Sequence, residues 1–230
     1  QGTFLEVLAL AARQRGWRAD IELFPQGAPA ADKLDARPTA TVRLREDASL
    51  KPDPLFDQVL RRRTNRLAYE PRLPSPAALQ AIASSVQPFA VRAGFTGNDP
   101  AQLQRHRAIA NEAWRIELLT PRTIMESYRV LRVGPGEIEA HRDGLSLNDP
   151  LVRAMTALGL FDRSKPPGKN DMAIRSQLKD FEKKIDATPA FFWLVTEGND
   201  RSTQVNAGRA YMRAQLAATS QGLFMQPLSQ

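Results

Sequence analysis

The chain has 230 residues, of which 42% are hydrophobic and 25% are charged, a composition that excludes the disordered and membrane-embedded classes. It has no cysteine, which excludes disulfides, thiolate metal sites, cysteine-ligated iron–sulfur clusters and thiol nucleophiles. The net charge of +7 favours an anionic partner, whether nucleic acid, a membrane surface or a phosphorylated small molecule. No apolar run approaches the roughly 20 residues needed to span a bilayer, so a membrane partner is not expected. One domain over residues 1–230 fits this length.

The first 60 residues predict a helix, two strands and a second helix. Apolar residues from Leu5 to Ala12 recur at helical spacing, and Gly16 can end that helix. Residues 19–24 and 39–44 alternate as strands on either side of a loop rich in Pro, Gly and Ala. The pair Asp53-Pro54 then opens a helix that runs toward a group of arginines. This opening is typical of an α/β or α+β protein.

The most distinctive stretch is residues 61–66, which holds four arginines and Thr64. Guanidinium groups are planar forks that match phosphate oxygens two at a time, and a hydroxyl can donate one bond more. The cluster could therefore hold a monophosphate. The alternative is that these cations lie at a helix C-terminus, favour its dipole by about 0.3–1 kcal/mol each and stay solvated.

The middle of the chain predicts helices over residues 76–86, 100–118 and 121–131, with a strand over 89–95. Residues 134–136, Gly-Pro-Gly, should break the third helix, and residues 137–141 form a brief helical segment. His106 is interpreted as a packed or surface histidine, since no second metal ligand stands at helical spacing. The group His141 to Gly144 could be a polar lid or a plain helix end.

The last third predicts helices over 151–160 and 172–184 around a loop at 166–170 that could act as a lid. The apolar run 190–196 predicts a central strand covered on both faces. Asp200 caps a final helix whose small residues allow either tight packing or the approach of a flat ligand. The tail, 223–230, is expected to be extended, lying against the polar edge of a ring system or on the surface.

Several catalytic signatures are missing from the sequence. It has no GxGxxG after a strand, no Walker loop, no nucleophile elbow and no HExxH. Metal catalysis is not expected from two histidines and no cysteine. Any chemistry is therefore expected to belong to a bound cofactor.

Residues 62–66, Arg-Arg-Thr-Asn-Arg, resemble the phosphate signature of the nitroreductase superfamily. The resemblance is closer to the Acg-type branch of that superfamily. The segments that resemble it follow one another along the chain in the same order: 62–69, 139–144, 207–210, 217–219 and 222–223. It implies an α+β FMN-binding fold in which a central, mostly antiparallel sheet is surrounded by helices. It also implies a duplication, so that the chain is a monomer with an internal pseudo-dimer (halves about 1–52 and 53–230) or a homodimer.

The same resemblance implies a site and an activity. Residues matching Arg62, Arg63, Thr64 and Arg66 would hold the FMN phosphate and ribityl chain, and the segment matching Pro227, Leu228 and Ser229 would lie against the isoalloxazine ring. No catalytic acid or base and no metal ligand is implied. Such proteins pass electrons from NADH or NADPH to nitroaromatics, quinones or related acceptors.

Two other functions stay open. The early Asn-x-Gln-Pro-Trp stretch and the basic C-terminal segment usual in the family are not in this sequence, so the protein could bind or sequester FMN without turnover. Basic nucleic-acid binding is a weaker alternative, because the arginines are interleaved with acids and no recognition motif is present. Residues 1–12 lack the pattern of a signal peptide, which favours a cytoplasmic protein unless an export signal has been removed.

Overall fold

The computed structural model describes residues 1–30, 33, 35–168 and 171–228. Its elements in chain order are α1 (Gly2–Gln14), β1 (Trp17–Leu23), β2 (Ala40–Glu46), the 3-10 helix η1 (Pro54–Gln58), α2 (Pro76–Ser85), β3 (Arg92–Phe95), α3 (Pro100–Leu119), α4 (Pro121–Arg129), β4 (Leu131–Val133), α5 (Gly134–Ala140), β5 (Leu145–Leu147), α6 (Pro150–Ala157), α7 (Met172–Asp186), β6 (Phe192–Val195) and α8 (Arg201–Ser220). Helices and strands are mixed, which confirms the α+β class in its coarse sense.

The chain divides into two compact units. Unit 1 holds Gln1–Leu103 and Pro189–Pro227, and unit 2 holds Gln104–Thr188 together with Leu228. Helix α3 begins in unit 1 and continues into unit 2. These boundaries differ from the halves 1–52 and 53–230 of the sequence analysis, and the single domain over 1–230 stays a prediction.

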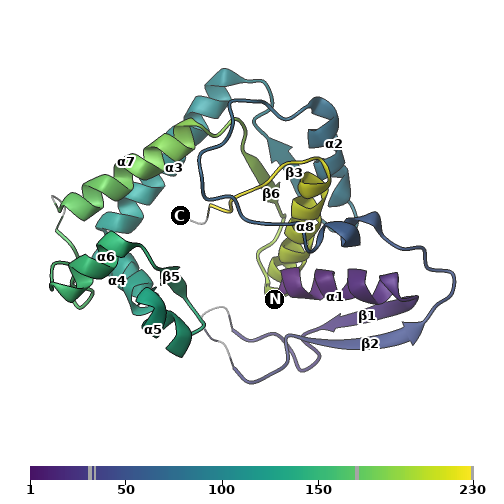
Figure 1. Ribbon diagram of the computed structural model, residues 1–230. Helices are drawn as coiled ribbons and strands as arrows, with labels where there is room; N and C mark the ends of the chain where they lie inside the picture. Colours follow the sequence, from purple (N-terminus) through teal and green to yellow (C-terminus); the bar gives the residue numbers. More distant parts are fainter. Residues whose placement is uncertain (31–32, 34, 169–170, 229–230) are drawn as a thin grey trace. The chain divides into compact units, whose positions relative to one another are not determined.

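Unit 1 is built on α8, against which α1 and α2 pack (Figure 1). The crossing of α1 and α8 is close, because a Cβ added at Gly2 would lie 2.0 Å from the carbonyl oxygen of Val205, and one at Gly208 would lie 3.3 Å from Cα of Gly2. The small residues of α8 therefore serve tight helix packing. The other side of α1 lies on the antiparallel hairpin β1–β2, whose register runs from Trp17 opposite Glu46 to Leu23 opposite Ala40 (Figure 1).

The core of unit 1 lies where α8 meets α2 and the β3–β6 pair. Its buried members are Ile82, Val86, Ala210, Ala214, Ala217 and Ala218. Phe192 and Leu194 of β6 pack against these residues, while a Cβ at Gly94 of β3 would meet the Trp193 ring at 2.3 Å. The ring therefore lies across a strand position where only glycine fits without movement.

The expected central sheet is not formed by the residues that the structure describes, which hold three separate two-stranded sheets. β6 pairs with β3 alone, antiparallel, from Arg92 opposite Val195 to Phe95 opposite Phe192. The apolar character of residues 190–196 is explained instead by the packing of β6 on the helical core of unit 1, and Val195 at the end of that strand is 39% exposed. A run of apolar residues alone does not distinguish these two situations.

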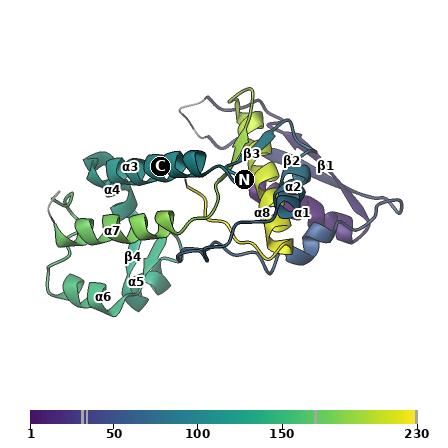
Figure 2. The ribbon, with the colours of Figure 1, turned by 90° about the horizontal axis from the view of Figure 1, so that it is seen from above.

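Unit 2 contains α4, α5, α6, α7 and most of α3, together with a small parallel pair of strands, β4–β5. Its core centres on Leu118, Ile124, Tyr128 and Ile174. Helices α3 and α7 meet where Trp114 stacks on Phe181, with ring centroids 5.0 Å apart (Figure 2).

Strands β4 and β5 were not predicted from the sequence, and the prediction that residues 134–136 break a helix was wrong. Gly134, with a φ of 80°, begins α5 rather than ending a helix. Three-residue strands are too short to display alternation, and their pairing joins residues 14 apart, which periodicity does not detect. Among the described residues, no helix has both the length and the apolar character needed to cross a bilayer.

Candidate functional site

The arginine segment follows η1, whose start is fixed by Asp53. One carboxylate oxygen of Asp53 accepts a hydrogen bond from the backbone N–H of Leu55 at 3.0 Å, which confirms the expected cap. The helix ends at Gln58, and the backbone N–H of Arg62 bonds to the Gln58 carbonyl at 2.8 Å in the turn that follows. The arginines therefore follow a short 3-10 helix rather than an α-helix, and the alternative that they favour a helix end and stay solvated remains a prediction.

The structure joins this segment to the C-terminal segment within unit 1. Thr64 and Met225 form an isolated parallel bridge, and the backbone N–H of Asn65 donates to the Met225 carbonyl at 3.3 Å. The guanidinium of Arg63 lies 4.3 Å from the centroid of the Phe224 ring, a cation–π contact. Two stretches that the sequence analysis assigned to one site thus lie side by side.

The remaining predicted site residues are placed as follows. Arg66 and Pro227 are exposed in unit 1. Leu228 is grouped with unit 2, and Ser229 lies outside the described residues. The part of the C-terminal segment that the structure describes within unit 1 therefore ends at Pro227.

Helix α8 supplies a neutral partner to Arg62. The guanidinium Nη1 donates to Oε1 of Gln215 at 3.2 Å, and Nε2 of Gln215 donates in turn to the Tyr211 hydroxyl. Gln215 is only 4% exposed, while Arg62 and Tyr211 are half-buried. The Gln215 amide is thus held by two partners, Arg62 of the arginine segment and Tyr211 one turn earlier on α8, and Arg62 is tied to α8 by a neutral group.

Two tyrosine hydroxyls lie in this cluster, and both stay protonated at neutral pH. Burial raises the pKa of Tyr69, against hydrogen bonds with the Asn65 side chain and the Gln226 backbone. Burial also raises the pKa of Tyr211, against the Gln215 amide and the charge of Arg62. Neutral phenols can donate hydrogen bonds, so each is a donor that a bound anion could use.

The charge of the cluster is uncompensated. None of Arg61, Arg62, Arg63 and Arg66 forms an ion pair with a carboxylate of the described residues. Three of these arginines are exposed, and Arg62 is not. A guanidinium that is partly removed from water without a counterion is costly, and an anionic ligand removes that cost.

A second arginine pair on α8 is fully compensated. Arg213 donates to Oε1 of Glu6 at 3.0 Å, to Oδ2 of Asp53 at 2.9 Å and to the Ser85 carbonyl at 2.9 Å. Arg209 donates to the other oxygen of Glu6 at 3.0 Å. Burial lowers the pKa of Arg213, but its bonds to the two carboxylates outweigh this and raise it. This network fixes α1, α2, α8 and the start of η1 to one another.

Other features do not form a site. The exposed group from His141 to Gly144 contributes one ion pair, between Arg132 and Asp143 at 3.1 Å, which lowers the pKa of Asp143. Within the described ranges, no group of three or more His, Cys, Asp or Glu side chains is placed to hold a metal ion. Residues 169 and 170 of the proposed lid loop lie outside those ranges.

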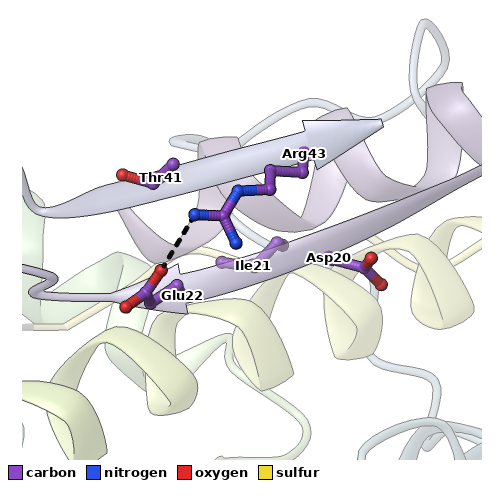
Figure 3. A pocket seen from close by; sticks show the side chains of 5 residues that line it. All are labelled: Asp20, Ile21, Glu22, Thr41 and Arg43. Atoms are coloured by element: carbon purple, nitrogen blue, oxygen red, sulfur yellow. Dashed lines mark ion pairs between the residues drawn. The ribbon is translucent and has the colours of Figure 1, made fainter. Parts of the chain in front are cut away.

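A shallow hollow on the hairpin β1–β2 is self-neutralised (Figure 3). Its lining is Asp20, Ile21, Glu22, Thr41 and Arg43. Arg43 lies 3.8 Å from a Glu22 oxygen, and Arg45 lies 3.0 Å from an Asp20 oxygen. Both acids already face a cation, so this hollow has no unbalanced charge with which to select a ligand.

Sequence reasoning missed Tyr211 and Gln215. They stand four residues apart on α8, a spacing that places both on one helix face, but nothing local marks that face as polar and functional. Gln215 is 153 residues from its partner Arg62, so only the tertiary structure relates them.

No protein-family model matches this chain, and no curated protein sequence matches it either.

Proposed function

We propose that the protein binds FMN through the arginine segment of unit 1 and acts as an FMN-dependent oxidoreductase, passing electrons from NADH or NADPH to a nitroaromatic, quinone or related small acceptor. The observation that supports it best is the arginine cluster without carboxylates, held against the C-terminal segment. The resemblance to the nitroreductase superfamily supplies the identity of the cofactor.

The donor set suits a phosphate monoester. A phosphate dianion has three terminal oxygens, and each can accept more than one hydrogen bond. Arg62 and the exposed Arg63 and Arg66 offer fork-shaped donors, and Thr64 offers a hydroxyl on the strand-like segment between them. Because the Arg62 charge is met only by a neutral amide, a dianion gains an ion pair there that the free protein does not make.

The chain's own residues would bind and orient the cofactor. Arg62, Arg63, Thr64 and Arg66 would hold the phosphate, and the segment ending at Pro227 would follow toward the ring, as the resemblance implies. FMN, when bound, supplies two-electron hydride chemistry that no side chain of the protein could supply. The tyrosines near Arg62 have raised pKa values, so they would serve as hydrogen-bond donors rather than as proton acceptors.

The visible absorption spectrum tests this proposal. Purified protein is mixed with FMN, passed through a desalting column and scanned, with riboflavin as the matched ligand that lacks only the phosphate. Retention of FMN but not of riboflavin is expected. Retention of neither would overturn the proposal.

FMN binding without turnover is a second candidate, because the Asn-x-Gln-Pro-Trp stretch usual in the family is not in this sequence. Anaerobic addition of NADPH or NADH to the flavin-loaded protein distinguishes the two candidates: bleaching of the flavin spectrum is expected of an oxidoreductase, and a flavin that stays oxidised with both donors identifies a binding protein.

A further inference from the structure

We infer that Gln215 is a positioning residue that holds Arg62 without compensating its positive charge and makes the Tyr211 hydroxyl a second donor to the anion that Arg62 binds. This inference rests on the proposed function only in naming that anion as the phosphate of FMN. It concerns how the protein makes the site selective for a dianion.

The direction of the hydrogen-bond chain is fixed by chemistry. An arginine has donors and no acceptor, so Gln215 must present Oε1 to Arg62. Its amide NH₂ therefore faces the Tyr211 oxygen, which accepts from Nε2. The Tyr211 proton is not used in the bond with Gln215, and no other described group accepts it in a hydrogen bond. Among the described residues, the hydrogen-bond chain therefore ends in an O–H donor without an acceptor.

Gln215 is neutral, unlike the partners of Arg209 and Arg213. These two arginines, six and two residues earlier on α8, meet the carboxylates of Glu6 and Asp53, and their charge is cancelled inside the protein. The partner of Arg62 is instead the amide of Gln215, which has the same shape as a glutamate side chain and is 4% exposed. An amide orients the guanidinium as a carboxylate would, but it leaves the positive charge for a ligand. A glutamate here would act as an internal competitor of the phosphate.

The ligand selected in this way has at least two acceptor oxygens and a negative charge. Arg62 supplies charge-assisted donors, and Tyr211 supplies a neutral one whose raised pKa keeps it protonated. A phosphate monoester meets both requirements, whereas riboflavin, which lacks the phosphate, has acceptor oxygens but no negative charge.

The test replaces Gln215 by glutamate and measures dissociation constants for FMN and riboflavin by flavin fluorescence. For Gln215→Glu, FMN affinity should fall about tenfold or more while riboflavin affinity stays within twofold. Tyr211→Phe should lower FMN affinity by about three- to tenfold, again without effect on riboflavin. Gln204→Glu is the matched control, because it also places a carboxylate beside an arginine of α8, Arg201, at an exposed position of the same helix. It should leave FMN affinity unchanged.

Inorganic phosphate separates this inference from the flavin assignment. Thermal unfolding with and without phosphate is followed by circular dichroism, for the wild type, Gln215→Glu and the isosteric apolar variant Gln215→Met. Strong stabilisation of the wild type, weaker stabilisation of Gln215→Met, which orients neither Arg62 nor Tyr211, and none of Gln215→Glu supports the inference even if FMN does not bind. FMN affinity within twofold of wild type in Gln215→Glu, or equal stabilisation of all three proteins by phosphate, would overturn it. If Gln215→Glu does not fold, Tyr211→Phe decides: unchanged FMN and phosphate binding overturns the inference.

Discussion

Two groups of arginines in unit 1 meet opposite surroundings. Arg209 and Arg213 lie against Glu6 and Asp53, which are 4% and 8% exposed, and every one of these charges has a partner. Arg62 instead meets the neutral amide of Gln215, and its neighbouring arginines in the segment 61–66 pair with no carboxylate among the described residues. The same residue type thus stabilises the fold in one group and remains available to an anion in the other, depending on whether a carboxylate lies beside it.

The difference separates stability from binding. A buried cation whose carboxylates are in place contributes to the fold and has little left to offer a ligand. A cation with a neutral partner contributes less to the fold and keeps its charge for an anion from solution. The two groups should therefore respond differently to mutation and to salt.

The largest expected effect is that of Arg213→Met on stability. The change leaves Glu6 and Asp53 buried with one cation fewer, and breaking such a buried pair costs about 3–5 kcal/mol. Urea unfolding followed by circular dichroism measures it. Arg43→Met is the control, because its 66% exposed side chain faces an exposed Glu22, and its loss should cost at most about 1 kcal/mol. Equal losses in the two variants would contradict the distinction between a structural and a surface pair.

The next effect concerns the ligand rather than the fold. Arg62→Ala combined with Arg66→Ala should weaken FMN binding by about 3 kcal/mol or more, since each charge-assisted contact contributes about 1.5–3 kcal/mol. Stability should fall by about 1–3 kcal/mol, less than in Arg213→Met, because the loss of Arg62 leaves the buried Oε1 of Gln215 without its donor but breaks no ion pair within the described residues. Ser229→Ala should act less, because a backbone contact at that position would survive.

A control for this pair removes the same amount of charge elsewhere. Arg43→Ala with Arg45→Ala takes two arginines from the exposed face of the β1–β2 hairpin. FMN affinity should be nearly unchanged in that variant. An equal loss in both double variants would mean that net charge, and not a site, attracts the flavin.

Salt should separate the groups without any mutation. The Debye length falls from about 10 Å at 0.1 M to about 3 Å at 1 M, and exposed charges such as Arg63 and Arg66 are screened most. FMN affinity should therefore fall as NaCl rises, whereas riboflavin affinity should not. Fluorescence titrations at several salt concentrations measure both, and parallel curves for the two flavins would remove the phosphate from the interaction.

Local signals predicted much of the fold. Ser75 accepts from the backbone N–H of Ala78 at 3.2 Å and Asp200 from that of Thr203 at 3.0 Å, as expected of N-caps, because a cap is decided within four residues. The strands β4 and β5 and the pairing of β6 were not predicted. Their existence depends on partners far away in the chain, and a short or apolar run carries no information about them.

The candidate site, like the fold, could be predicted from the sequence only where its signal is local. The arginines stand together in the sequence, so their cluster is visible there. What makes it a site is the absence of carboxylates around it and the presence of Gln215, and both are properties of the folded chain. An amide at position 215 looks no different in the sequence from the exposed Gln204 or Gln221 of the same region.

The smallest expected effect concerns Arg163 of unit 2. This arginine is intermediate between the two groups, because it has a carboxylate partner but lies at the surface. Its guanidinium donates to both oxygens of Glu137 at 2.7 and 2.9 Å, and the backbone N–H of Val133 donates to the same carboxylate at 2.8 Å. Bonds from Arg163 first, then from Val133, lower the pKa of Glu137 to about 2 from an ordinary 4.5. Because the Glu137 side chain is 41% exposed, solvent screening limits its stabilisation at neutral pH to about 1 kcal/mol.

The sign of the pH dependence follows from a depressed pKa in the folded state. The stabilisation is complete above pH 4.5 and is lost as the pH falls toward 2, where the folded protein also takes up the proton. Glu137→Gln should therefore be less stable than the wild type at pH 7, and the difference should shrink to nothing near pH 2. Urea unfolding of both proteins between pH 2 and pH 7 measures this. A difference that persists at pH 2 would mean that the variant loses packing rather than charge, and that Arg163 belongs with the fixed arginines of α8 rather than between the two groups.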